Sequence, residues 1–247
     1  MDIIYSMPGQ SHRIFINVVH ACPNACFFCV DFKGDRFFGF DLKNRRPYSA
    51  DEIIGAVEKY PNRHAISDVY FCGIGEPLLR YDTIMETAKK IRQLFPPHTV
   101  LAINTSGTFF LRNPRVDFAK HFDLIQVSLN AENEEKYNAI CRPKINGAYR
   151  ALMAFLHELR TYLDKTKIPC HVELSIVDTS DVESLPVHER LLKNIPKPDF
   201  EACRIIAEGF GWPLKVKSLI KNCELEEWQD FSETVRKSIN NATMDNI

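Results

Sequence analysis

The stretch "CPNACFFC", residues 22–29, holds three of the eight cysteines of a 247-residue chain. Three residues separate Cys22 from Cys26, and two residues separate Cys26 from Cys29. The stretch follows "RIFINVV" at residues 13–19, whose β-branched and aromatic residues predict a strand. Three thiols are therefore expected in one loop, directly after a strand.

Thiols at this spacing fit several kinds of site. Cys26 and Cys29 form a C-x-x-C pair, which is typical of a redox pair or of half a zinc site. A structural zinc needs a second pair of ligands, and a redox pair leaves Cys22 unexplained. The remaining cysteines stand singly: Cys72, Cys141, Cys170, Cys203 and Cys223. Three thiolates around an iron–sulfur cluster leave one iron with an open coordination position, which a catalytic metal site requires.

Composition limits the class of protein. Hydrophobic residues make up 45% of the chain and charged residues 26%, which fits a packed core and one domain of barrel size. The net charge of −1 argues against a nucleic-acid surface. No apolar run reaches membrane-spanning length, and the first residues lack the pattern of a secretory signal. We therefore expect a cytoplasmic protein with reduced thiols and no membrane partner.

Strand-like and helix-like segments alternate along the chain. Strands are predicted at residues 13–19, 68–72, 99–104, 124–129, 171–177 and 215–219. Between them, Ser49 with Glu52 forms a capping box, and Asp82 is expected to cap a helix that stops before Pro96. Alternation of this kind predicts an α/β fold with a mostly parallel sheet, either a partial barrel or an open doubly wound sheet. Functional residues are then expected at the carboxyl ends of the strands.

Specific polar residues stand at those ends. They lie in "FCGIGEP" (residues 71–77), "NTSG" (104–107) and "SLN" (128–130), although ordinary turns also use such residues. A dinucleotide-binding motif is excluded because Leu78 stands where G-x-G-x-x-G needs its last glycine. On the fifth predicted strand, Glu173 either points into the barrel or is an edge or insertion-facing carboxylate, and we interpret it as the latter.

These motifs together resemble the radical S-adenosylmethionine (radical SAM) superfamily. "CPNACFFC" matches its C-x₃-C-x₂-C signature, and "GIGEP" is similar to its G-G-E-P motif with Ile74 in place of a glycine. The resemblance extends from about Arg13 to Leu219. The segments "FCGIGEPLLR", "INTSG", "SLNAENEEKYNAICRP" and "EACRIIAEGFGWPLKVKSL" are most similar to the TatD-associated radical SAM proteins.

The resemblance implies a fold and a chemistry. The fold would be a partial (β/α)6 barrel in a single domain over residues 1–247, with its core at about 12–220 and a C-terminal helical segment at 221–247. Cys22, Cys26 and Cys29 would hold one [4Fe–4S] cluster that cleaves SAM reductively to a 5′-deoxyadenosyl radical. That radical would take hydrogen from an unidentified substrate at an unidentified abstraction site. A flavodoxin or ferredoxin-type reductant and a functional link to a TatD-family hydrolase are also implied.

The resemblance also assigns contacts to SAM. Gly73, Ile74, Gly75 and Glu76 would meet its amino group, and Phe28 its adenine; Asn104, Thr105, Ser128 and Asn130 would meet the ribose or carboxylate. Arg142 would pair with the carboxylate, or is a solvated arginine.

Two other functions stay open. A glycyl-radical-type activating enzyme fits the compact length, although no ferredoxin-like insert follows Cys29. A non-enzymatic iron–sulfur protein would have no need of the SAM-contacting segments.

Overall fold

The computed structural model describes residues 2–30, 37–43, 46–179 and 196–218. The strands are β1 (Ile4–Tyr5), β2 (Arg13–Ile16), β3 (Asp68–Phe71), β4 (Val100–Thr105), β5 (Leu124–Ser128), β6 (His171–Val177) and β7 (Leu214–Lys217). The α-helices are α1 (Ala50–Glu58), α2 (Tyr81–Leu94), α3 (Glu134–Cys141), α4 (Ala148–Thr166) and α5 (Phe200–Gly209). The C-terminal helical segment predicted at 221–247 lies outside the described residues.

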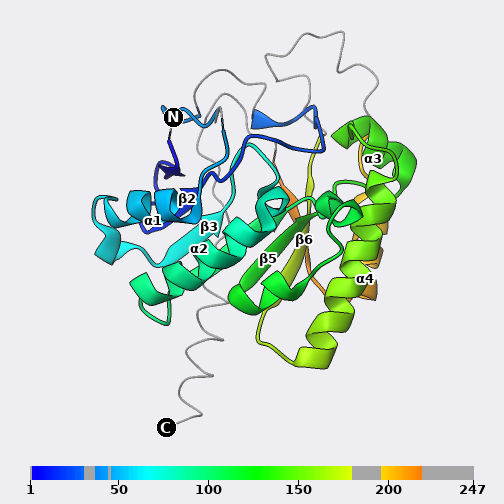
Figure 1. Cartoon of the computed structure of the whole chain (residues 1–247). Helices are drawn as coiled ribbons and strands as arrows, with labels where there is room; N and C mark the ends of the chain where they lie inside the picture. The colour runs from blue at the N-terminus through cyan, green and yellow to red at the C-terminus, as the bar shows by residue number, and fades with distance from the viewer. Residues whose placement is uncertain (1, 31–36, 44–45, 180–195, 219–247) are drawn as a thin grey trace.

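All seven strands belong to one sheet, and their order in the sheet is their order in the chain. β1 pairs with β2 in the antiparallel sense, and every later pair is parallel. A doubly wound sheet would need the strand order to reverse at one point. Helices α1, α2 and α4 instead lie on one side of the sheet (Figure 1). The fold is therefore the predicted partial barrel, with β1 as an additional edge strand that the sequence analysis missed.

The two faces of the sheet have different partners. Ile14, Val69 and Leu101 face the helices and belong to the large core cluster that also holds Ile53 of α1 and Ile84 of α2. The alternate residues face the interior of the barrel, because successive side chains in a strand point to opposite faces. These interior residues form a smaller apolar cluster with Tyr5 of β1 and Ile74: its strand members are Phe15, Tyr70, Val100, Ala102 and Leu124.

The helix ends follow from local sequence, with one exception. The capping box of Ser49 and Glu52 is present at α1, and α2 ends before Pro96 as predicted. The prediction that Asp82 caps α2 is wrong, since Arg80 holds the N-cap position. The 3₁₀ turn at Pro77–Arg80 runs directly into α2, so the chain is already helical when it reaches Asp82.

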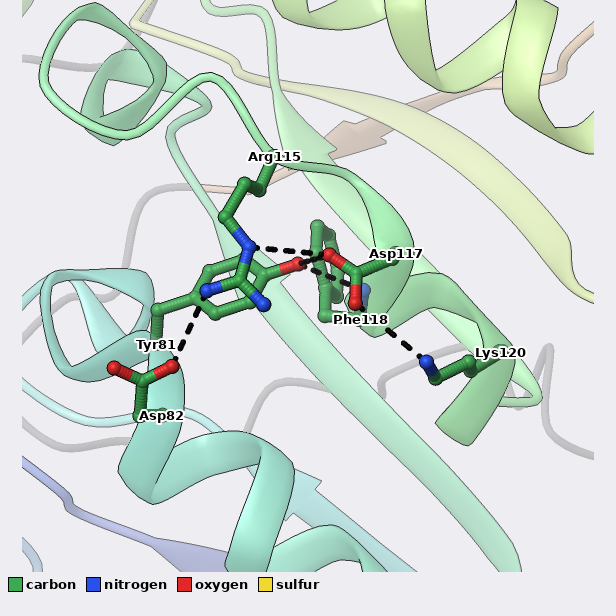
Figure 2. A network of polar contacts seen from close by, with 6 residues as sticks. All are labelled: Tyr81, Asp82, Arg115, Asp117, Phe118 and Lys120. Carbon is green, nitrogen blue, oxygen red and sulfur yellow. Dashed lines mark hydrogen bonds and ion pairs between the residues drawn. The ribbon is translucent and has the colours of Figure 1, made fainter.

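A polar network joins the start of α2 to the 3₁₀ turn at Asp117–His121 on the helical side of the sheet (Figure 2). The hydroxyl of buried Tyr81 donates to the Asp117 carboxylate over 2.6 Å and accepts from the backbone N–H of Phe118 over 2.9 Å. Arg115 lies over the Tyr81 ring, 4.2 Å from its centroid, and pairs with Asp117. Burial and the Asp117 charge raise the pKa of Tyr81, so the hydroxyl stays a donor.

We expect Tyr81→Phe to lower the free energy of unfolding by about 1–3 kcal/mol, because it leaves the buried Phe118 N–H without an acceptor. Lys120→Met is the matched control, since Lys120 pairs with the same carboxylate from an exposed position. This control should change the free energy of unfolding by less than about 1 kcal/mol. Urea denaturation of both variants measures the difference. If both variants lowered the free energy of unfolding by the same amount, the Tyr81 hydroxyl would not be the central group of the network.

Candidate metal and cofactor site

The cysteine loop, residues 17–30, is held against the carboxyl end of α3. Its backbone N–H groups at Ala25 and Phe27 donate to the carbonyls of Cys141 and Ile140, over 3.0 and 3.3 Å. The side-chain amide of Asn24 donates to the hydroxyl of Tyr137 over 2.9 Å. The last carbonyls of a helix have no partner within it, so α3 can bind a loop that has no regular structure of its own. This anchoring fixes the backbone that carries the three thiols.

The three thiols share one electrostatic environment. Cys22, Cys26 and Cys29 are all half-buried. Burial, followed by the charge of Glu76 and then those of Cys26 and Cys29, raises the pKa of Cys22 to about 12. A hydrogen bond with the Cys141 thiol, followed by burial, raises the pKa of Cys26. The loop thus brings its thiols close to one another, and the protein alone keeps these two protonated at neutral pH.

This donor set fits an iron–sulfur cluster better than a single metal ion. Among the described His, Cys, Asp and Glu residues, no three converge as ligands of one ion would. A [4Fe–4S] cluster binds each thiolate through a different iron, so its ligands surround the cluster instead of meeting at a point. A bound cation also supplies the positive charge that crowded, half-buried thiols need in order to ionise.

The glycine turn after β3 packs directly against the cysteine loop. A Cβ atom on Gly75 would lie 1.9 Å from the carbonyl oxygen of Val19 and 2.7 Å from that of Ala21. A Cβ atom on Gly73 would lie 2.0 Å from Oδ1 of Asn17. Such distances leave no room for any side chain. Gly75 is therefore required by the close approach of two backbones, and Gly73 by the buried side chain of Asn17, whatever contact they also make with SAM.

Ile74 and Glu76 complete this turn. Ile74 is buried in the interior cluster, and its backbone N–H donates to Oδ1 of Asn17 over 3.3 Å. The Glu76 carboxylate accepts hydrogen bonds from the Thr105 hydroxyl over 2.8 Å and from the backbone N–H and hydroxyl of Ser106, each over 2.7 Å. Burial raises the pKa of Glu76, and the Ser106 and Thr105 hydrogen bonds oppose that rise. Glu76 and Thr105 thus bind each other and tie the end of β3 to the end of β4.

The other residues expected to contact SAM are placed in different ways. Arg142 ends α3 beside the cysteine loop, where its charge partly opposes the rise in the pKa of Cys26 caused by the Cys141 hydrogen bond and burial. Asn130 is buried in a left-handed conformation (φ 60°) and donates to the Cys141 thiol over 3.4 Å. Ser128 and Asn104 are half-buried at the ends of β5 and β4, respectively. The Phe28 ring packs against the Phe27 ring, with 5.4 Å between their centroids. Their contacts with SAM remain predictions.

The sequence analysis missed two residues that hold the site. Asn17 is fully buried and bridges the glycine turn to the carbonyl of Leu42, which its Nδ2 reaches over 2.7 Å. Ser106 supplies two of the bonds to Glu76. The signal for Asn17 was a single amide inside an apolar run, and the signal for Ser106 was a hydroxyl in a strand-end turn.

Comparison with known proteins now identifies the family. The family model described as the radical SAM superfamily matches residues 16–172, more than half of the 247 residues. The chain belongs to the radical SAM superfamily. The matched region begins at the last residue of β2 and includes the cysteine loop, the glycine turn and β3 to β5. The predictions of a radical SAM fold and of membership in this enzyme family are confirmed. The narrower placement among the TatD-associated radical SAM proteins stays a prediction.

Two curated relatives are named "Probable dual-specificity RNA methyltransferase RlmN". The protein of Trichodesmium erythraeum (strain IMS101) is 28% identical over 178 residues, which cover 70% of this chain and 48% of the relative. That of Nostoc punctiforme (strain ATCC 29133 / PCC 73102) is 30% identical over 186 residues, 73% of this chain and 47% of the relative. The chain thus spans about half the length of these relatives, so the similarity does not carry over their whole activity.

A solved structure supports the fold. The structure entitled "Structure of TYW1 with a lysine-pyruvate adduct bound" superimposes with a TM-score of 0.54 and 13% sequence identity. The match covers 93% of this chain and 73% of that chain. At this identity the similarity concerns the fold alone. In the described part of the chain, no helix is long and apolar enough to cross a bilayer.

Proposed function

We propose that this chain is a radical SAM enzyme that cleaves SAM and uses the product radical to take hydrogen from a substrate. The observation that carries the proposal is the direct packing of the Gly73–Glu76 turn on the loop that holds Cys22, Cys26 and Cys29. When bound, a [4Fe–4S] cluster with SAM supplies the reductive cleavage of the sulfonium bond to methionine and a 5′-deoxyadenosyl radical. An iron–sulfur carrier would need the cysteines and the support of their loop, but no residues placed to bind SAM beside the cluster.

The residues of the chain have separate roles in this proposal. Cys22, Cys26 and Cys29 would bind three irons, and the α3 carbonyls that hold their loop would fix its position. Arg142, close to Cys26, offers a planar guanidinium that suits the SAM carboxylate. Because Glu76 is bound by Thr105, Ser106 and Leu78, it would orient the backbone of the turn toward the SAM amino group. The main contribution of the protein is orientation and exclusion of water.

Several finer statements belong to the same proposal. We place the chain with the TatD-associated subgroup on its four sequence segments, with a TatD-family hydrolase as a functional neighbour. A flavodoxin or ferredoxin-type protein would supply the electron, and the setting would be cytoplasmic. A glycyl-radical-type activating enzyme is the alternative within the superfamily, in which the substrate would be a partner protein.

Anaerobic reconstitution tests the proposal. The purified chain is incubated with iron, sulfide, dithionite and SAM, and 5′-deoxyadenosine and methionine are quantified by mass spectrometry. We expect both products in equal amounts and in excess over the enzyme. A protein that acquires its cluster but neither binds nor cleaves SAM would contradict the proposal and favour a non-enzymatic iron–sulfur protein.

A further inference from the structure

Three polar side chains lie in one row on the interior face of the sheet. Asn104 of β4 is the register partner of Gln126 on β5, and Gln126 is the partner of Glu173 on β6. We call these three residues the acceptor row. Gln126 and Glu173 are only 2% and 1% exposed. The expectation that Glu173 is an edge or insertion-facing carboxylate is therefore wrong: it lies inside the barrel, because the apolar residues that alternate with it pack against the helices.

The amide nitrogens of the row are bonded, whereas its amide oxygens are not. Nε2 of Gln126 donates to the Glu173 carboxylate, and Nδ2 of Asn104 donates to the Cys72 thiol over 3.2 Å. These bonds orient the two amides. Among the described residues, neither Oε1 of Gln126 nor Oδ1 of Asn104 has a hydrogen-bond partner, and both atoms are buried. A buried acceptor without a donor costs about 1–3 kcal/mol, and folded proteins rarely leave one unfilled.

The charges around the row favour a neutral donor over a cation. Lys217 of β7 is half-buried within electrostatic range of Glu173 and Cys72, and its removal from water lowers its pKa. Lys215 adds a second positive charge close to Lys217. Glu173 thus has a lysine of its own chain within electrostatic range, so a ligand ammonium is not needed to balance this carboxylate. An uncharged N–H group, such as an amide or a ring amino group, is a sufficient donor.

The row lies one layer below the end of the barrel that carries the cysteine loop. Gln126 precedes Ser128 by two residues and therefore points to the same face. Ser128, Asn104 and Cys72 are half-buried at the carboxyl ends of their strands. Along the strands, Ser128 thus lies closer to this end of the barrel than Gln126 does, and Asn104 is level with Gln126.

We propose that the acceptor row is a binding subsite for a neutral N–H donor group of the substrate, either a carboxamide or an amino-substituted heterocycle. The amide oxygens of Gln126 and Asn104, on neighbouring strands that lie about 5 Å apart, would accept from its N–H bonds. This proposal gives Asn104 to the substrate instead of to the SAM ribose or carboxylate. That the ligand is the substrate rests on the proposed function; that the row binds such a group does not.

Equilibrium dialysis of the reconstituted, SAM-saturated protein tests the subsite with two pairs of probes. The pairs are benzamide with N,N-dimethylbenzamide, and cytidine with N4,N4-dimethylcytidine. We expect at least one N–H-bearing probe to bind about tenfold or more tightly than its dimethylated match, which has no N–H to donate. Gln126→Met, which keeps the side-chain length and removes both polar atoms, should abolish this preference.

Thr87→Val is the matched control. Thr87 of α2 also has a buried hydroxyl without a partner among the described residues, but it lies on the helical side of the sheet. This variant should keep the probe preference. Gln126→Met removes the unfilled acceptor and also the Nε2 hydrogen bond to Glu173, so thermal unfolding of this variant serves only to show that it is folded.

Two results would overturn the subsite. The first is that neither pair shows a preference in the wild type. The second is that Gln126→Met preserves one. Dialysis measures binding and does not depend on turnover. Selective binding of a probe by a protein that never cleaves SAM would therefore contradict the proposed function but not the subsite. Cleavage of SAM by a protein that binds neither N–H-bearing probe selectively would contradict the subsite but not the proposed function.

Discussion

Replacement of Cys26 by alanine is expected to remove the iron–sulfur cluster and to reduce 5′-deoxyadenosine formation below detection. Cys26 is the central thiol of the loop, and its neighbours Ala25 and Phe27 bind the end of α3, so no other residue of the loop can take its place without breaking those bonds. The wild-type chain should hold about four irons in its cluster. Iron and sulfide analysis after anaerobic reconstitution measures the loss, with SAM cleavage as the second measurement.

Cys170→Ala is the control for this variant. Cys170 lies just before β6, where burial and the Asp123 charge raise the pKa of its thiol. It belongs to no loop with another cysteine, so the variant should keep the wild-type iron content and activity. Full SAM cleavage by Cys26→Ala would show that the metal site has been assigned to the wrong residues. Loss of half the iron in Cys170→Ala would show that a second cluster exists.

The features of the fold that depend on residues close together in the sequence were predictable. Alternation of strand-like and helix-like segments gave the α/β class and six parallel strands, because their side-chain period is local. The choice between a partial barrel and a doubly wound sheet depends on which strands pair, and both folds alternate in the same way. β1 has only two residues, Ile4 and Tyr5, which is too short for any period to show. Its place depends on pairing with β2.

The site was predictable where its residues are adjacent in the chain. The three cysteines share a loop, so their spacing indicated a metal or redox site, and the resemblance to the radical SAM superfamily implied a [4Fe–4S] cluster there. The need for Gly75 comes instead from the carbonyls of Val19 and Ala21, more than fifty residues earlier, and no local pattern shows such an approach. Glu173 was misplaced for a similar reason. Its alternation with apolar residues assigns it to one face of β6, but the pattern does not say that this face is the barrel interior.

Gly75→Ala is expected to have the second largest effect, since it forces the turn away from the cysteine loop. The added Cβ would lie 1.9 Å from the Val19 carbonyl oxygen, and that oxygen belongs to backbone that cannot rotate aside. Relief of the overlap would also lengthen the 2.9 Å hydrogen bond from the Glu76 N–H to the Ala21 carbonyl. We expect a loss of about 2–4 kcal/mol in the free energy of unfolding. Because the displaced backbone leads directly to Cys22, iron content should fall in the same variant.

Gly55→Ala separates this effect from the general cost of replacing a glycine. Gly55 lies within α1, and a Cβ there would meet no atom within 4 Å. Alanine is the better helix former, so this variant should gain about 0.5–1 kcal/mol in the free energy of unfolding and keep its cluster. Thermal unfolding of the reconstituted proteins should therefore move the two midpoints in opposite directions. If Gly75→Ala kept both the wild-type midpoint and the wild-type iron content, the turn would not support the cysteine loop, and the glycines would have to be explained by contact with SAM alone.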